Sequence, residues 1–275
     1  MPLYINTNVA SLESQRSLSN ASASLNTSFQ RLSSGMRINT AADDAAGLGI
    51  SESLKAQVRS LGVAERNSNN AISMSQTAEG ALGQVGNMLG RMREIAVQGA
   101  NGDLTATDRG YLNTEFTALR DEITRIADST KFNGKDLLSG ASTAVTFQVG
   151  INTAADQISV TFGGVDLTSL GINASTVDGA TATNAQASIT ALDGAIGAVS
   201  SRRADFGASM NRLTNTVSNL QSMKSNMSAA NSRIRDVDVA EESAALARTQ
   251  VLQQAAVSML SQANQAPQLA LSLLR

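Results

Sequence analysis

The strongest constraint on the fold is an unbroken heptad pattern toward the C-terminal end of the chain. From Ile189 to Ile234, seam residues recur at alternating spacings of three and four, which makes about six heptads. Such a run is typical of a long helix that packs along a partner helix. The apolar residues of this predicted seam include Ile196, Val199, Phe206, Met210, Leu213, Val217, Leu220 and Met227. Arg203, Lys224 and Asn231 also occupy seam positions, where polar residues either set the register or, as long side chains, snorkel out of the seam. The sequence leaves both interpretations open.

A second long helix is expected from Thr40 to about Gly99, because apolar residues recur there at helical spacing. At ~1.5 Å per residue this helix would be on the order of 85 Å long. Thr40 and Asp43 have the spacing of a capping box, in which each side chain satisfies a free backbone N–H of the first turn. Asp43 and Asp44 could also suggest a metal site or an acid–base pair. We favour a role at the helix N-terminus, because the chain has no His and Thr40 is available as a cap partner.

A shorter helix is predicted next. Thr105 and Asp108 form another capping-box pattern, and apolar residues follow at helical spacing. The dipeptide Asn133-Gly134 then indicates a turn.

The pattern changes to period two in the middle of the chain. Apolar and polar residues alternate over residues 145–149 and again over residues 158–162. This alternation predicts a β-hairpin with a long connection. The glycine-containing residues that follow, about 163–185, are expected to form a loop.

Both ends of the chain are poor in charge and carry apolar residues at helical spacing. Residues 249–274 contain no charged side chain, yet their many Gln and Asn residues argue against a membrane span. We expect the two ends to form helices that bury themselves against copies of the same chain, with an intramolecular hairpin as the alternative. The residues predicted to carry this assembly are Leu18, Leu25, Leu32, Leu252, Met259, Leu260 and Leu271.

The composition suits a helix bundle and removes several kinds of chemistry. Hydrophobic residues make up 42% of the chain but aromatic residues only 3%, so the core would be mainly aliphatic. With no Cys and no His, the chain lacks thiol nucleophiles, histidine bases and the usual zinc ligands. A net charge of −2 gives no reason to expect nucleic acid or an anionic membrane as a partner. No catalytic, cofactor-binding or metal-binding residues are predicted.

Several ordered motifs resemble those of bacterial flagellin. They are INTN at residues 5–8, LSSGMRINTAADDAAGL at 32–48, FNG at 132–134, SRIRDVD at 232–238, QQA at 253–255, QANQAPQ at 262–268 and LSLLR at 271–275. The likeness covers both ends and the long helices. The chain is therefore identified as resembling a short flagellin without substantial outer variable domains.

The resemblance implies a structural subunit that polymerises into the extracellular flagellar filament used for swimming. It implies export through the flagellar type III apparatus without a cleaved signal peptide, which agrees with the absence of a basic, apolar leader at residues 1–8. The implied partners are further copies of the chain, the export apparatus and export chaperone, and the filament cap and hook-junction proteins.

The implied fold is mainly α, a long antiparallel helical bundle or coiled coil with a small β-hairpin. The terminal helices would pair, become ordered on assembly and form the inner filament core. By this resemblance, residues 1–40 and 237–275 form the inner-core domain. The outer-tube domain comprises helices at 41–140, the hairpin at 141–170, a short loop at 171–184 and a long helix at 185–236.

One helical stretch resembles the flagellin segment recognised by a Toll-like innate receptor. Carried over by position, the main contacts would be Arg91, Ile95 and Glu115. Recognised family members usually carry Gln where this chain has Gly90. The same residues would also lie between filament subunits, so the resemblance leaves receptor binding and filament contact both open.

Two other kinds of protein compete with a filament subunit. A hook–filament junction protein or a secreted coiled-coil adhesin could share the paired termini, although the heptads, hairpin and terminal motifs favour flagellin. An enzyme is not expected, because the metalloprotease found in some flagellins needs a His-Glu-x-x-His helix and this chain has no His.

Overall fold

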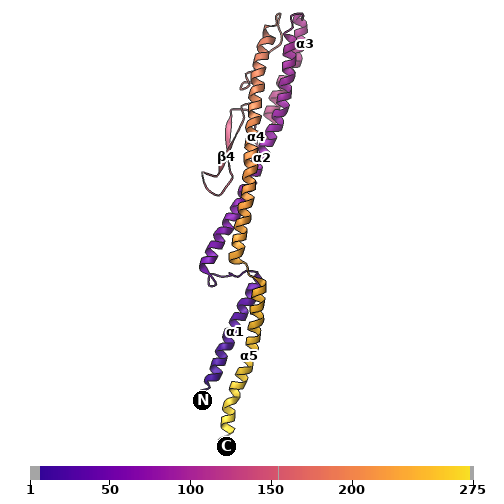
Figure 1. The fold of residues 1–275 in the computed structure, drawn as a ribbon. Coiled ribbons are helices and arrows are strands. Elements are labelled where there is room, and N and C mark those ends of the chain that lie inside the picture. Colours follow the sequence, from indigo (N-terminus) through magenta and orange to yellow (C-terminus); the bar gives the residue numbers. More distant parts are fainter. Residues whose placement is uncertain (1–6, 154, 273–275) are drawn as a thin grey trace. The chain divides into compact units, whose positions relative to one another are not determined.

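The computed structural model describes residues 7–153 and 155–272, and the side chains of the last helix as far as residue 265. Its helices are α1 (Val9–Ser34), α2 (Ala45–Gly99), α3 (Ala106–Ser129), α4 (Thr183–Arg235) and α5 (Val239–Ser272) (Figure 1). Its strands are β1 (Lys131–Phe132), β2 (Lys135–Asp136), β3 (Thr143–Gln148) and β4 (Gln157–Phe162). The predicted fold class, antiparallel helix pairs with a small β-hairpin, is confirmed.

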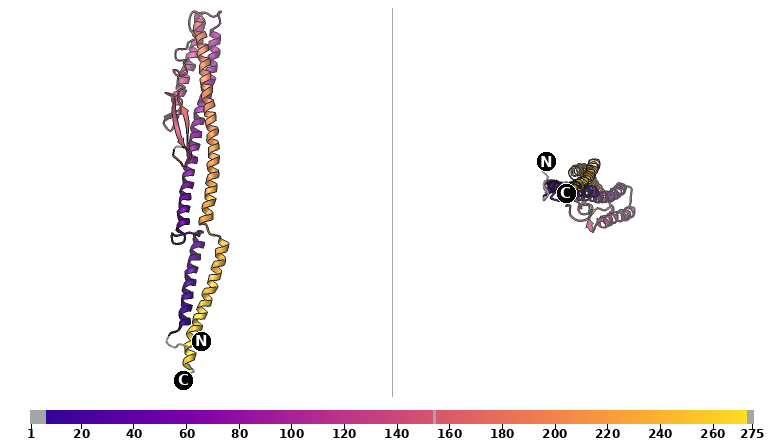
Figure 2. Two further views of the ribbon diagram at one scale, coloured as in Figure 1. Left: turned by 60° about the vertical axis from the view of Figure 1, so that its left-hand side comes forward. Right: turned by 90° about the horizontal axis from the view of Figure 1, so that it is seen from below.

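The chain divides into two compact units. The terminal unit comprises residues 1–56 and 226–275, and it contains α1, α5 and the adjoining ends of α2 and α4. The central unit, residues 57–225, contains the rest of α2 and α4 together with α3 and the strands. Within the terminal unit α1 lies beside α5, and within the central unit α2 lies beside α4, as two views agree (Figures 1 and 2).

The hydrophobic core belongs to the central unit. It lies between α2, α3, α4 and the β3–β4 hairpin. Buried residues on α2 alternate at spacings of three and four, and those on α4 recur every heptad, as the sequence pattern predicts. Fully buried members include Leu82, Leu89, Met92, Phe116, Ile123 and Leu192. The core thus consists mainly of aliphatic side chains, and its one aromatic pair joins Phe162 to Phe206 with ring centroids 5.3 Å apart among the described residues.

The β3–β4 hairpin confirms the period-two prediction. Its strands are antiparallel, with Val145 opposite Val160 and Phe147 opposite Ile158. Exposed and buried residues alternate along β4, so one face of the hairpin packs onto the core.

A second, very small hairpin was not anticipated. β1 and β2 pair on either side of Asn133-Gly134, and both turn residues have positive φ, 49° and 77°. Tight two-residue hairpin turns need such angles, which Asn and Gly adopt most easily. The sequence indicated the turn, but strands of two residues are too short to produce a periodic pattern.

The predicted start of the second helix is wrong. α2 begins at Ala45, and Asp44 is its cap, because its carboxylate accepts the Gly47 N–H at 2.8 Å and its carbonyl accepts the Leu48 N–H at 3.0 Å. Asp43 instead closes the preceding turn by accepting the N–H and hydroxyl of Thr40. Thr40 and Asp43 thus make one of the two capping-box bonds, from the Thr40 N–H to the Asp43 carboxylate, without a helix to cap.

The other capping-box prediction is confirmed. Thr105 is the N-cap of α3, and its hydroxyl accepts the Asp108 N–H at 3.3 Å while the Asp108 carboxylate accepts the Thr105 N–H at 3.0 Å. At the end of α1, Gly35 caps the helix in the left-handed conformation with φ 68°.

The segment before α4 is loop, as predicted, but it contributes to the core. Val165, Leu170, Ile172 and Val177 are all buried there. α4 then begins at Thr183, ahead of the first heptad residue, Ile189.

In the part of the chain that the structure describes, no helix has the length and apolarity of a membrane span. This part also contains no cluster of three or more acidic residues arranged to hold a metal ion.

Candidate assembly surfaces

The α1–α5 pair has a seam of small and polar residues. Leu18, Leu25 and Leu32 on α1 are half-buried, and the buried residues of α1 are Ser11 and Ser28. The less exposed positions of α5 recur at spacings of three and four, and they include Thr249, Gln253, Ala256, Leu260 and Ala263. Small side chains let the two helix backbones come close, but they bury little apolar surface.

Polar contacts hold the far ends of the pair together. The Asn8 side chain caps α1 by accepting the Ser11 N–H, and its amide donates to the Ala263 carbonyl of α5 at 2.7 Å. The Ser11 hydroxyl donates to the Asn264 side chain at 2.8 Å. These bonds fix how the two helices face one another, so the outward faces are defined as well.

Large apolar side chains project from the outward faces of this pair. Those exposed are Val9, Leu12, Phe29, Val239, Val251, Leu252, Val257 and Met259. Among the described residues of the terminal unit, the one large apolar side chain in the buried core is Ile38, in the α1–α2 connection. Apolar side chains gathered in this way are typical of protein–protein contact sites.

The structure separates the predicted assembly residues into two groups. Leu18, Leu25, Leu32 and Leu260 are half-buried between α1 and α5. Leu252 and Met259 are exposed, at 55% and 63%. The Leu271 side chain lies outside the described residues. Sequence reasoning missed Val251 as a surface apolar residue, because a helical pattern alone does not tell which of two adjacent stripes faces the partner helix.

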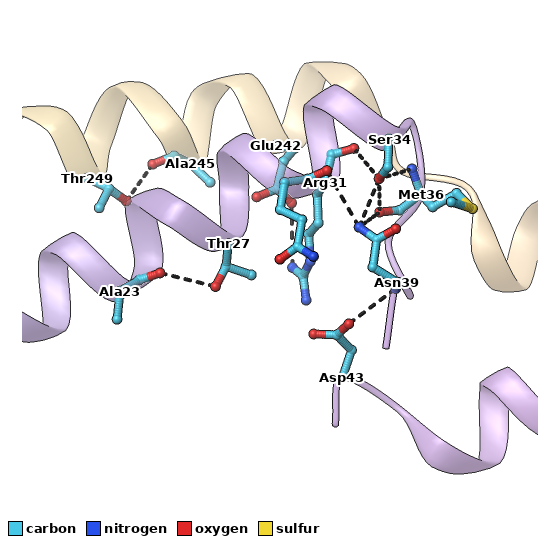
Figure 3. Close-up of polar contacts among 11 residues, drawn as sticks. Ala23, Thr27, Arg31, Ser34, Met36, Asn39, Asp43, Glu242, Ala245 and Thr249 are labelled. Atoms are coloured by element: carbon cyan, nitrogen blue, oxygen red, sulfur yellow. Dashed lines mark hydrogen bonds and ion pairs between the residues drawn. The ribbon is translucent and has the colours of Figure 1, made fainter. Parts of the chain in front are cut away.

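The connections at the inner ends of α1 and α5 form a small polar joint within the terminal unit (Figure 3). Met36 and Asp236 pair as an isolated antiparallel β-bridge, with the Arg37 N–H donating to the Arg235 carbonyl at 2.6 Å. The Asn39 amide donates to the Ser34 hydroxyl at 2.8 Å at the end of α1. The joint thereby holds the end of α1 beside the start of α5.

The turn at Asp43 belongs to the same joint. Bonds from the backbone N–H and the hydroxyl of Thr40, together with the Asn39 N–H, lower the pKa of the Asp43 carboxyl. Nearby, Arg31 and Glu242 form an ion pair between α1 and α5, with 3.6 Å between nitrogen and oxygen. It lines a polar groove of about 530 Å³ in the terminal unit. No arrangement of these groups suggests catalysis.

The predicted α4 seam consists of two rows of residues, each with heptad spacing, and in the central unit one of these rows is buried. Leu192, Val199, Phe206, Leu213 and Leu220 are buried at heptad spacing. The intervening apolar positions, Ile196, Met210 and Val217, are half-buried. Met227 continues the first row into the terminal unit and is half-buried there.

Two of the polar seam residues of α4 form ion pairs with α2. Arg203 pairs with Glu79 at 2.7 Å and Lys224 with Glu65 at 3.2 Å. Asn231, in the terminal unit, is half-buried, and its side-chain oxygen has no hydrogen-bond partner among the described residues. The two cations therefore make specific contacts with the partner helix rather than only extending into solvent.

The residues suggested as receptor contacts are not equally accessible. Arg91 pairs with Glu115 of α3 at 2.9 Å and also with Glu94. The Glu94 and Glu115 carboxylates raise the pKa of the Arg91 guanidinium. Ile95 is 1% exposed and lies in the core, so a partner could contact only the surface above it.

Sequence reasoning missed the one charged residue that is buried among the described residues. Arg109, at the start of α3, is 2% exposed and donates to the carbonyls of Gly99, Asn101 and Ala180. These bonds satisfy backbone carbonyls at the end of α2 and connect this end to the loop before α4. The sequence context of Arg109 gives no sign of this role, because the acceptors come from the folded chain.

A well-packed central unit and a terminal helix pair with outward apolar faces define a class of helical subunit that packs against other chains. Comparison with known proteins identifies the family. Residues 5–143 match the model of the bacterial flagellin N-terminal helical region, and residues 189–274 match that of the C-terminal helical region. The chain belongs to the bacterial flagellin family, whose members are structural subunits of the flagellar filament.

Relatives match along the whole chain. A flagellin of Halalkalibacterium halodurans is 45% identical over 273 residues, covering 99% of this chain and 100% of the relative. A flagellin of Bacillus subtilis is 41% identical over 307 residues, covering 99% of this chain and 100% of the relative. The solved structure of a Vibrio parahaemolyticus protein described as flagellar hook-associated shares the fold, with a TM-score of 0.60, 18% identity, and coverage of 70% of this chain and 100% of that one.

Proposed function

We propose that this chain assembles into its filament chiefly through the outward apolar faces of α1 and α5. The observation that carries the proposal is the exposure of large apolar side chains on helices with almost no core of their own. Covering these side chains with a neighbouring subunit would remove apolar surface from water, which is the main favourable term in protein association. Leu252 and Met259 would contact neighbours directly.

The half-buried leucines have a different role in this proposal. Leu18, Leu25, Leu32 and Leu260 hold α1 and α5 together, so that the outward faces are presented in a fixed arrangement. Leu271 is proposed as a further contact on the basis of sequence alone. The inner-core domain would comprise residues 1–40 and 237–275, and the outer-tube domain residues 41–236.

The free chain would keep its central unit folded while its terminal helices become stably ordered on assembly. Low charge and many small polar residues make the terminal segments poor at forming a core unaided. Contacts with neighbouring chains would supply the missing burial.

Other parts of the proposal rest on family membership. The chain would be exported without cleavage of a signal peptide, and would meet the export apparatus, its chaperone, the filament cap and the hook-junction proteins. It would have no enzymatic activity. Arg91 and Glu115 would contact either a neighbouring subunit or a host Toll-like receptor, and the buried Ile95 would contribute only through the core beneath that surface.

The test is seeded polymerisation of purified chain followed by electron microscopy. The intact chain should extend sheared filament seeds, and a chain lacking residues 246–275 should not. Long tubes from both chains would overturn the proposal. If the intact chain stayed monomeric with ordered ends, a junction or adhesin role would replace it.

A surface variant sharpens the same test. V251S/M259S removes two exposed apolar side chains of α5, neither of which lines the groove between α1 and α5, and it should raise the monomer concentration needed for seed growth at least 10-fold. Q254S/S258Q changes two exposed polar residues on the same helix and serves as the matched control. Equal growth of both variants would show that this face is not the contact surface.

A further inference from the structure

Three ion pairs join α2 to α4 along the central unit. Glu65 pairs with Lys224 at 3.2 Å, Glu79 with Arg203 at 2.7 Å, and Arg93 with Asp193 at 2.6 Å. Glu65 also accepts the Gln221 side-chain amide at 2.9 Å. The three α2 positions are spaced two heptads apart, so they follow one edge of the helix.

The first part of the apolar seam beside this edge contains little information about register. Over its first part, the α2 seam is a repeat of small residues: Ala64, Ser68, Ala71, Ser75 and Ala78. The facing α4 positions repeat a large apolar side chain every heptad, from Val199 to Leu220. A seam that repeats with the heptad favours several alignments that differ by whole heptads.

The signs of the three pairs are not uniform. Along α2 the charges are negative at Glu65 and Glu79 but positive at Arg93. Sliding α4 by two heptads toward the N-terminus of α2, ~21 Å at 1.5 Å per residue, would place Asp193 opposite Glu79. Sliding it the other way would place Arg203 opposite Arg93. Each slip would therefore create one repulsive contact and leave one attractive contact, Arg203 with Glu65 or Lys224 with Glu79, whereas the observed alignment has three attractive ones.

We infer that the reversed pair Arg93–Asp193 acts with the other two pairs to select the register of α2 against α4 by penalising two-heptad slips. Its effect is a difference between alignments, so it does not require any one exposed pair to be strongly stabilising. This gives a use to Arg203 and Lys224, whose seam positions the apolar pattern does not explain. The inference concerns the free chain and does not depend on filament assembly.

The test keeps all three attractions but changes the order of signs. R93E/D193R makes α2 uniformly negative and α4 uniformly positive at these positions, which removes the repulsion from both slipped alignments. The variant E65K/K224E/E79R/R203E makes these three α2 positions uniformly positive and their α4 partners uniformly negative, and it leaves Arg93 and Asp193 untouched. E79R/R203E is the matched control, because it reverses one pair yet still creates a repulsion in either slip.

Spin-label distances measure the alignment directly. The chain has no Cys, so cysteines placed at the exposed positions Gln84 and Ala198 can carry the only labels. After refolding from denaturant, the parent chain and E79R/R203E should each show one distance. Both uniform variants should show a second population, displaced along the helix axis by ~21 Å. A single, unchanged distance in the uniform variants would overturn the inference, and testing two of them provides a result if one fails to fold.

Discussion

The central and terminal units both contain long helices paired side by side, yet they bury very different side chains. In the central unit, α2 and α4 enclose leucine, valine, methionine and phenylalanine together with α3 and the β3–β4 hairpin. In the terminal unit, α1 buries Ser11 and Ser28 and leaves Phe29 50% exposed. A helical heptad pattern therefore predicts that helices pair, but the size of the residues in it decides whether the pair has a core of its own.

The difference also separates two uses of apolar residues. In the central unit they stabilise the folded chain, and in the terminal unit many of them face outward. A filament subunit needs both, because it must fold as a unit and still retain a surface that only neighbouring copies cover.

Phenylalanine truncation should affect the two units unequally. Phe116 is fully buried in the central core, so Phe116→Ala should lower the free energy of unfolding by ~3–5 kcal/mol. Phe29→Ala, in the terminal unit, should leave the unfolding of the free chain unchanged. Chemical denaturation followed by circular dichroism measures both. Equal destabilisation would mean that the terminal pair has a core comparable to the central one.

Loss of the buried arginine should come next. Arg109→Leu leaves the carbonyls of Gly99, Asn101 and Ala180 without this donor. Of the three bonds only the one to Gly99 is fully buried, and an unsatisfied buried acceptor costs ~1–3 kcal/mol. The midpoint of thermal unfolding should fall clearly. Arg125→Leu is the control, because Arg125 is exposed and pairs within its own helix with Glu122, and it should have no measurable effect. Equal midpoints of thermal unfolding for the two variants would contradict a stabilising role of the Arg109 hydrogen bonds.

The two capping-box sequences should respond differently to the same substitution. Thr105→Ala removes the N-cap of α3 and should cost ~1 kcal/mol of central-unit stability. Thr40→Ala alters a turn in the terminal unit and should not change the unfolding of the central unit. Urea denaturation of both variants measures the difference. A larger loss from Thr40→Ala would show that the two units unfold together.

Acid should weaken the α2–α4 ion pairs by a small amount. The side chains of Gln221 and then Lys224 lower the pKa of Glu65 below its ordinary 4.5, and Arg93 lowers that of Asp193 below 3.8. Because both carboxyls have lower pKa values in the folded chain, they stabilise the folded chain at pH values above their ordinary pKa. This stabilisation is lost as the pH falls through their lowered pKa values. The stability of E65Q/D193N should therefore depend less on pH between about 4.5 and 2 than that of the parent chain. If the stability of the variant and of the parent chain depended on pH in the same way, Glu65 and Asp193 would not be the groups responsible.

Sequence alone predicted the helices, the hairpin and the cap at Thr105, because each depends on residues close together in the chain. It failed at Thr40, where the residues of a capping box close a turn and Asp44 caps the helix instead. It also could not distinguish the two apolar stripes of α5. Leu252 and Leu260 both fit a helical pattern, but only the partner helix α1 determines that Leu260 is half-buried while Leu252 faces outward. Ile95 is similar, since its burial depends on the packing of the central unit.

We propose that the terminal unit lacks a sufficient core until other copies cover it. Amide hydrogen exchange of the free chain and of assembled filaments tests this claim most directly. We expect α1 and α5 to exchange rapidly in the free chain while buried segments of α2 and α4 are protected, and all four helices to be protected in the filament. Strong protection of α1 and α5 in the free chain, unchanged on assembly, would contradict the account.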